Sequence, residues 1–147
     1  MRKVKDSIPL IEDEEGLGRI VRGLRTVAVV GMQDESKALF PAFLIPQRVK
    51  AAGIRVIPVN PHVSELLGER CYPDLEAVPE AVDIVDIFRR SEFVPEIVEA
   101  AIRKGAKLIW MQEGVVHEDA ARRAQAAGLA VVMDRCILKD HRRMAQV

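Results

Sequence analysis

The sequence predicts an α/β fold in which a five-stranded parallel sheet carries helices on both faces. Apolar segments rich in β-branched residues alternate with helical patterns five times, which indicates βαβ units with right-handed crossovers. The apolar segments are continuous, as is typical of strands buried on both faces. The chain has 147 residues, the length of one domain, with 49% hydrophobic and 30% charged residues. We expect residues 11–147 to form this domain and residues 1–10 to form a flexible arm.

A helix and a buried strand open the predicted domain. The acidic run at residues 12–15 suits a helix N-terminus, and apolar residues follow at helical spacing up to Leu24. A strand over residues 26–30 then ends at Gly31, which lets the chain turn sharply and lets a ligand come close. Ligands of such sheets bind outside the carboxyl ends of the strands, so we expect Gly31 to begin a binding loop. The alternative is that Gly31 only makes a tight turn.

Proline governs the next helix. Pro46 has no N–H to donate, so it either starts a helix or kinks one, and we favour a helix over residues 46–52 that Gly53 terminates. A second strand is expected over residues 54–59. Short helical turns are expected over residues 62–67 and 74–78.

The C-terminal half repeats strand and helix more regularly. Helix 94–104 has Pro95 in its first turn, basic residues at its end and Gly105 after it, in agreement with the dipole and the C-cap rule. The remaining predicted elements are strands over residues 82–88, 107–111 and 129–133, a helix over 118–127 and a last helical stretch over 136–144.

Composition excludes several classes of function. Lys plus Arg and Asp plus Glu number 22 each, and zero net charge argues against non-specific nucleic-acid binding. No apolar run approaches the roughly 20 residues that span a membrane, and no apolar segment follows the basic N-terminus as in a signal peptide. Cys71 and Cys136 form no Cys-x-x-Cys pair, which favours free thiols in a cytoplasmic protein.

Parallel strands bring their carboxyl ends to one edge of the sheet, and polar residues gather in those loops. Backbone N–H groups and a helix N-terminus in the first loop can hold a phosphate, and nearby cations can add charge-assisted contacts. We therefore predict a nucleotide site with several phosphates. The candidate residues are Gly31, Met32, Gln33, Ser36, Lys37, Asn60, Pro61, His62, Phe88, Arg89, Arg90, Gln112, Glu113 and Gly114.

The dinucleotide and P-loop patterns are both missing. The first loop has one glycine where Gly-x-Gly-x-x-Gly needs three, and Asn60 stands where an acid would bind a ribose diol. No histidine has a cysteine or carboxylate at nucleophile or metal spacing, and Cys136 has no paired base. We expect no catalytic residue and no metal, and we interpret Asp83 and Asp86 as partners of helices or backbone.

Several segments together resemble the small, stand-alone CoA-binding protein family and, more distantly, the CoA-binding domain of the succinyl-CoA synthetase α subunit. These segments are residues 27–31, 58–61, 82–90, 105–107 with 110–112, and 133–136. The resemblance extends from about Leu24 to Met144. It implies a Rossmann-like, doubly wound sheet of strand order 3-2-1-4-5 that binds coenzyme A. It assigns the pyrophosphate to the first loop, the adenosine to the region of Asn60 and Phe88, and the pantetheine to residues 112–114.

The first loop departs from the family pattern of Gly-Ala-Ser with Pro-x-Arg soon after. Gln33 replaces the serine, Asp34 and Glu35 add negative charge, and Lys37 is the candidate to replace the arginine. We predict a cytoplasmic protein that binds CoA or acyl-CoA without a catalytic centre of its own. The alternatives are an acyl-CoA-handling enzyme or subunit that acts with a partner chain, and a regulatory module with weakened nucleotide binding. Self-association or a partner subunit stays open.

Overall fold

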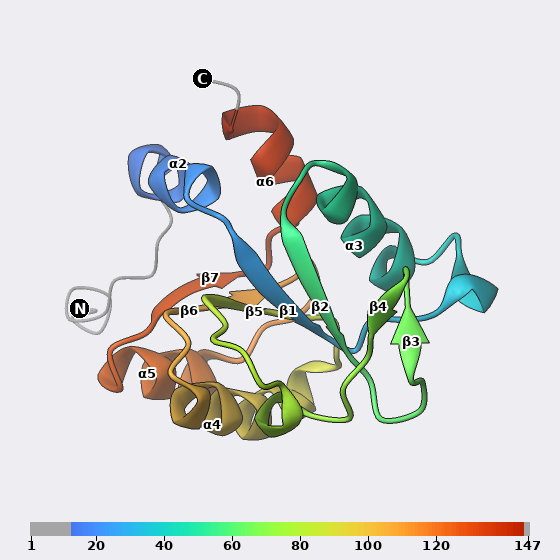
Figure 1. The fold of residues 1–147 in the computed structure, drawn as a ribbon. Helices are drawn as coiled ribbons and strands as arrows, with labels where there is room; N and C mark the ends of the chain where they lie inside the picture. Colours follow the sequence, from blue (N-terminus) through green and yellow to red (C-terminus); the bar gives the residue numbers. More distant parts are fainter. Residues whose placement is uncertain (1–12, 146–147) are drawn as a thin grey trace.

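The computed structural model describes residues 13–145 and has the predicted α/β architecture (Figure 1). The arm expected over residues 1–10 lies outside the described residues. The main sheet consists of β1 (Thr26–Val30), β2 (Arg55–Val59), β5 (Ile84–Ile87), β6 (Leu108–Met111) and β7 (Ala130–Met133). The helices are α2 (Glu14–Arg22), α3 (Pro41–Ala51), α4 (Val94–Lys104), α5 (Glu118–Ala126) and α6 (Ile137–Met144). Short 3-10 turns, namely η1 (Glu35–Lys37), η2 (Leu75–Ala77) and η3 (Ser91–Phe93), and a small hairpin of β3 (Glu65–Leu66) and β4 (Glu69–Arg70) complete the described elements.

The sheet is parallel throughout, but its strand order corrects the expectation. The order is β2-β1-β5-β6-β7, which is 2-1-3-4-5 in the numbering of the five predicted strands, so 3-2-1-4-5 is wrong for these five. The outer side of β2 is instead occupied by Tyr72, which forms a parallel bridge with Val59. Its N–H donates to the Pro58 carbonyl at 3.1 Å, and its carbonyl accepts from the Asn60 N–H at 2.8 Å. When this bridge is counted as the third strand, the order becomes 3-2-1-4-5-6. A single bridged residue before Pro73 is too short for the sequence to reveal as a strand.

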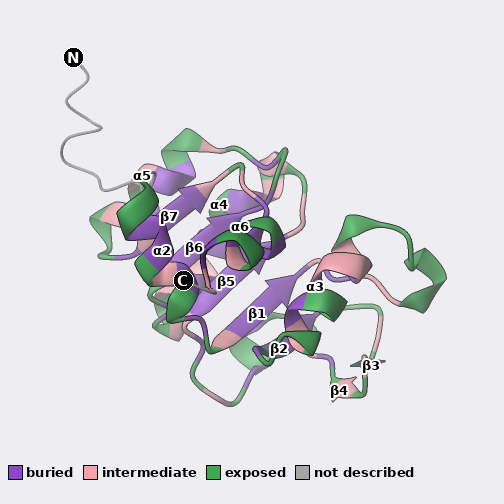
Figure 2. Cartoon of the chain, turned by 90° about the horizontal axis from the view of Figure 1, so that it is seen from above, coloured by how far each residue is buried: buried purple, intermediate pink, exposed green. Residues whose placement is uncertain are grey.

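Helices cover both faces of the sheet, as predicted (Figures 1 and 2). Side chains alternate along each strand, so β1 directs Ala28 and Val30 to the face under α4 and α5. Val27 and Val29 lie on the opposite face, in one cluster with residues of α2, α3 and α6. Four residues of β1 are buried, which explains its continuous apolar sequence.

Helix α3 begins earlier than the sequence indicated. It starts at Pro41, and Pro46 is buried inside it rather than at its start. A proline in this position leaves the carbonyl four residues earlier without its helical partner. That carbonyl belongs to Ala42, and it accepts the N–H of Gln33 at 3.0 Å instead. The loop after β1 thus compensates for the proline and is anchored on the first turn of α3.

The helical turn expected over residues 62–67 is wrong. Residues 65–70 form the β3–β4 hairpin, in which Leu67 (φ 53°) and Gly68 (φ 74°) are the two turn residues. Positive φ at both positions is typical of a type I′ hairpin turn, but leucine rarely takes this conformation, so the turn has no clear sequence signal. Helix α4, by contrast, has the predicted bounds, and Gly105 terminates it with φ 84°. None of the helices in residues 13–145 is long and apolar enough to cross a membrane.

Candidate functional site

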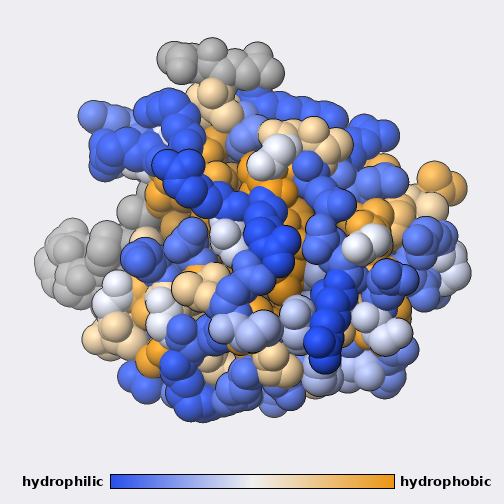
Figure 3. Space-filling model, in the orientation of Figure 1, coloured by the Kyte–Doolittle hydropathy of each residue, from blue (hydrophilic) through white to orange (hydrophobic). Residues whose placement is uncertain are grey.

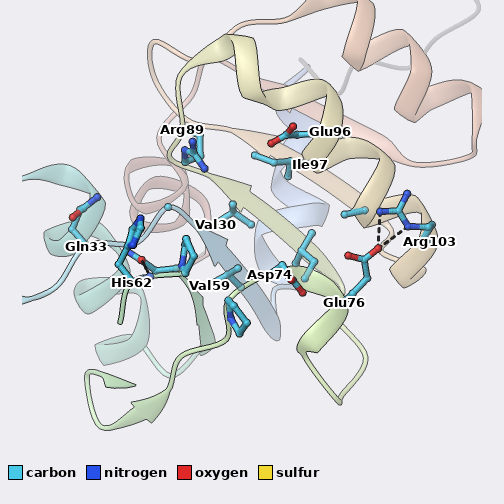
Figure 4. Close-up of a pocket in the computed structure, with 16 residues that line it drawn as sticks. Val30, Gln33, Val59, His62, Asp74, Glu76, Arg89, Glu96, Ile97 and Arg103 are labelled. Atoms are coloured by element: carbon cyan, nitrogen blue, oxygen red, sulfur yellow. Dashed lines mark hydrogen bonds and ion pairs between the residues drawn. The ribbon is translucent and has the colours of Figure 1, made fainter. Parts of the chain in front are cut away.

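A cleft of about 420 Å³ opens at the carboxyl ends of β1 and β2, between the loops after these strands and helix α4 (Figure 4). Apolar side chains of the strand ends, η2 and α4 form one part of its lining, and polar side chains form the rest. A volume of this size is typical of small-molecule sites. The lining residues are Val30, Gly31, Gln33, Val59, Asn60, Pro61, His62, Pro73, Asp74, Leu75, Glu76, Arg89, Glu96, Ile97, Ala100 and Arg103.

Gly31 allows the close approach of two loops at the mouth of the cleft. Its φ is 91°, in the left-handed region that favours glycine, and its N–H donates to the Val59 carbonyl at 3.0 Å. A Cβ at this position would lie 2.4 Å from the carbonyl oxygen of Phe88. The glycine is therefore required by packing between the loops after β1 and β5. It also leaves the backbone open to a ligand in the cleft.

Asn60 organises the loop after β2. Its Nδ2 donates to the Met32 carbonyl at 2.7 Å, and its Oδ1 accepts the His62 N–H at 2.7 Å. The side chain is 7% exposed, so both polar groups are used inside the protein. Asn60 joins the loops after β1 and β2 and positions His62 on the rim of the cleft.

The two ends of the cleft differ in charge. Gln33 and His62 lie at one end with Arg89 nearby, whereas Glu76 and Arg103 lie at the other (Figure 4). Arg89 stacks on the ring of Phe93 at 4.2 Å and has no ion pair within residues 13–145. Arg103 is paired with Glu76, with its Nε at 2.8 Å from Oε2, so its charge is neutralised. The end with Arg89 is therefore the better place for an anionic group.

Carboxylates that the sequence analysis missed also line the cleft, with Glu76 of η2 at the end near Arg103 and Glu96 in the first turn of α4 (Figure 4). Asp74 lines the cleft while its Oδ1 accepts the Ala77 N–H at 2.9 Å and caps η2. The α4 residues at the cleft are Glu96, Ile97, Ala100 and Arg103. Their spacing of three and four residues is that of one helix face, and this was the signal that could have identified them.

Several predicted residues lie away from the cleft. Met32 is fully buried in the core, and Phe88 meets Gly31 through its carbonyl without lining the cleft. Ser36 donates to the Asp34 carboxylate at 2.5 Å, and Lys37 lies over the Phe40 ring at 5.4 Å.

Two charged residues that were predicted beside the phosphates, Asp34 and Arg90, also lie away from the cleft. Asp34 caps η1, and the hydrogen bond from Ser36 lowers the pKa of the Asp34 carboxyl. Asp34 was expected beside the pyrophosphate, but it does not line the cleft. Arg90 is exposed, 3.9 Å from Glu92, and it does not line the cleft either.

Residues 112–114 form a separate part of the same sheet edge. The buried Gln112 accepts the Ile137 N–H on its Oε1 at 3.1 Å and so caps α6. Glu113 pairs with Lys139 at 3.1 Å. The Gly114 N–H donates to Asp134 at 2.7 Å. These residues hold β6, β7 and α6 together and do not line the cleft.

The cysteines and His117 lie away from the cleft and have structural surroundings. No group of three or more His, Cys, Asp or Glu side chains in residues 13–145 could hold a metal ion. Cys71 and Cys136 are free and buried, and burial raises the pKa of the Cys71 thiol, which disfavours the reactive thiolate. His117 accepts the Ala120 N–H at 3.1 Å and caps α5.

Comparison with known proteins identifies one matching family model and several similar chains. The model of the CoA binding domain family matches residues 25–142. The uncharacterized protein YneT of Bacillus subtilis is 34% identical over 122 residues, which cover 83% of this chain and 89% of YneT. A solved hypothetical protein from Pyrococcus horikoshii has a TM-score of 0.85 and 32% identity over 91% of this chain and 93% of its own. The ADP-forming acetate–CoA ligase II of Archaeoglobus fulgidus is 32% identical over 85 residues, 56% of this chain but 12% of the ligase.

Proposed function

Since this chain belongs to the CoA-binding domain family, we propose that it binds coenzyme A, or an acyl-CoA, in the cleft at the ends of β1 and β2. The observation that carries the proposal is the cleft itself. It combines an apolar lining with Arg89, a cation that has no carboxylate partner in residues 13–145. CoA has the matching parts, an aromatic adenine and several phosphates.

The charge of the cleft sets the direction of the ligand. The phosphates face the end formed by Gln33, His62 and Arg89, where a charge-assisted hydrogen bond contributes about 1.5–3 kcal/mol. The adenine lies on the apolar lining formed by Leu75 and Ile97. The carboxylates at the far end disfavour a phosphate but can accept hydrogen bonds from ribose hydroxyls.

Binding is proposed as the activity of this chain by itself. Both thiols are buried and His117 caps α5, so none of these three groups is placed to act as a nucleophile or base in the cleft. The free state of both cysteines also supports a cytoplasmic location. One alternative, an enzyme or subunit that handles acyl-CoA with a partner chain, is favoured by the similarity to one segment of a much longer ADP-forming ligase. The other alternative, a regulatory module with weakened nucleotide binding, rests on the altered first loop.

Calorimetric titration with CoA, dephospho-CoA, acetyl-CoA, NAD and ATP tests the proposal. We expect CoA to bind and NAD to bind more weakly. Arg89→Ala should weaken CoA by about 10- to 150-fold, because one charged hydrogen-bond partner is lost. Arg90→Ala is the matched control, since Arg90 is an exposed neighbour outside the cleft, and it should change the affinity by less than about threefold.

Two results would contradict the proposal. NAD binding as tightly as CoA would reject CoA specificity. Equal losses of CoA affinity in Arg89→Ala and Arg90→Ala would reject the proposed contact between Arg89 and a phosphate. A smaller loss for dephospho-CoA than for CoA in Arg89→Ala would assign Arg89 to the 3′-phosphate, whereas equal losses would assign it to the pyrophosphate.

A further inference from the structure

The segment between β1 and α3 exposes two large apolar side chains that the cleft does not use. Leu39 is 89% exposed and Phe40 is 55% exposed. The η1 segment projects from the body of the domain beside α3 (Figures 1 and 2). An apolar pair on a projecting loop is unfavourable in a monomer and typical of an interaction surface.

The outer face of α3 continues this apolar surface. Phe40, Leu44, Arg48 and Ala51 follow one another at helical spacing, and Ala51 is an exposed small residue. The C-terminal half of α3 borders a groove of about 530 Å³ against α6, whose lining includes Ala51, Ala52 and Leu138. Apolar surface is visible between hydrophilic side chains on the face shown in Figure 3. The small alanines leave room for side chains of another chain.

Charge complements shape on these two surfaces. Arg48, His141 and Arg142 also line the groove, and neither arginine has a carboxylate partner in residues 13–145. The projecting segment carries Asp34, Glu35 and Lys37, two acids and one base, so its net charge is −1, and Glu35 has no ion pair within the described part of the chain. An acidic, apolar loop and a basic, partly apolar groove therefore occur on the same molecule.

We propose that the protein forms a two-fold dimer in which α3 packs antiparallel against α3 of a second copy. The loop lies at the N-terminal end of α3 and the groove at its C-terminal end, about 16 Å apart along an 11-residue helix. An antiparallel pair brings each loop to the groove of the other copy, so both contacts form at once, as two-fold symmetry requires. Because the chain has zero net charge, no long-range electrostatic repulsion between the two copies opposes this pairing.

Light scattering and sedimentation equilibrium over a wide concentration range test the dimer. We expect a mass twice the 16.4 kDa of the chain. Leu39→Ser should raise the dissociation constant of the dimer by about a hundredfold, because two buried leucines are lost per dimer. Val116→Ser is the matched control, since Val116 is also exposed (41%) but lies after β6, outside α3 and α6, and it should leave the dimer unchanged.

A charge exchange tests the docking of the loop in the groove. Glu35→Arg and Arg142→Glu should each weaken the dimer by at least about tenfold, because each places like charges together. An equimolar mixture of the two variants should restore a heterodimer, since every loop then meets a groove of opposite charge. Lys107→Glu, at an exposed position before β6, should have no effect.

A monomeric mass at every concentration would overturn the proposal, and so would a dimer that Leu39→Ser leaves intact. Failure of the mixture to recover the dimer would reject the loop-in-groove contact. A monomer in which Leu39→Ser weakens acyl-CoA but not CoA would assign the loop to the acyl chain instead. The outcomes that concern the mass and the mixed dimer do not depend on whether CoA binds to the cleft.

Discussion

Asp86 is a buried acid whose replacement should change how stability depends on pH. It lies in the middle of β5, between Val29 of β1 and Trp110 of β6, on the face that packs against α2 and α6. The side chain is 1% exposed, and its Oδ1 has no hydrogen-bond partner in the described structure. Burial raises the pKa of this carboxyl well above its ordinary value. The sequence analysis expected a helix or backbone partner for Asp86, and Oδ1 has none.

The sign follows from proton binding. Between the unfolded pKa of about 3.9 and the raised folded pKa, the folded state holds a proton on Asp86 that the unfolded state has lost. Stability must therefore fall as pH rises through this window, by up to about 1.4 kcal/mol for each pH unit crossed. Asp86→Asn keeps the shape of the side chain but cannot ionise. The free energy of unfolding of Asp86→Asn, relative to that of the wild type, should therefore rise by the same amount for each pH unit.

Urea unfolding of both proteins from about pH 4 to about pH 8 measures this difference, because contributions from all other groups cancel. Asp83→Asn is the control, since Asp83 is a partly exposed acid just before β5 and the charge change is the same. A difference curve for Asp86→Asn that is flat with pH, or that matches the control, would refute the reasoning. It would mean that Asp86 is solvated or paired in solution.

Three further predictions concern the cleft and the core. Gly31→Ala should lose about 2–5 kcal/mol of stability in urea unfolding, because the positive φ and the contact with Phe88 both oppose a Cβ. Gly53 also has a positive φ but faces open space, so Gly53→Ala should lose only about 1–2 kcal/mol. Equal losses in the two variants would reject the explanation by contact with Phe88. Leu17→Ala should lose about 2–5 kcal/mol in thermal or urea unfolding, since Leu17 is fully buried in α2, and a loss near zero would separate α2 from the core. The affinity for CoA should fall as salt rises in calorimetric titration, and a constant affinity would argue against phosphate contacts with His62 and Arg89.

Local pattern was sufficient for the regular part of the fold. The bounds of α4 follow from Pro95 at its start and Gly105 at its end, and both act within a few residues of the chain. Two departures occur where a distant partner decides the local structure. Pro46 is tolerated inside α3 because Gln33 occupies the carbonyl of Ala42.

The second departure is the short strand at Tyr72, which exists only because β2 offers it a ladder partner. Hydrogen bonds of this kind join segments that are far apart in the sequence. They leave no periodic signal.

The predicted site residues likewise fall into those that local sequence places at the cleft and those whose position depends on the path of a loop. Strand ends identify the loops that share an edge, and this was enough to place Gly31, Gln33, Asn60, Pro61, His62 and Arg89 at the cleft. It was not enough to say which way a loop residue points. Lys37 and Arg90 differ from Arg89 in loop path, not in charge, and both remain outside.

Sequence by itself determined the α/β class, the parallel strands, the helices on both faces and the edge at which the cleft opens, because these depend on periodicity and on residues close in the chain. Tertiary structure alone decided that Glu76 and Arg103 neutralise each other, that Gln112 caps α6, and that one face of α4 lines the cleft. These features depend on which side chains meet after the helices pack on the sheet. Packing depends on the distances in space between residues far apart in the sequence, and local sequence patterns do not specify these distances.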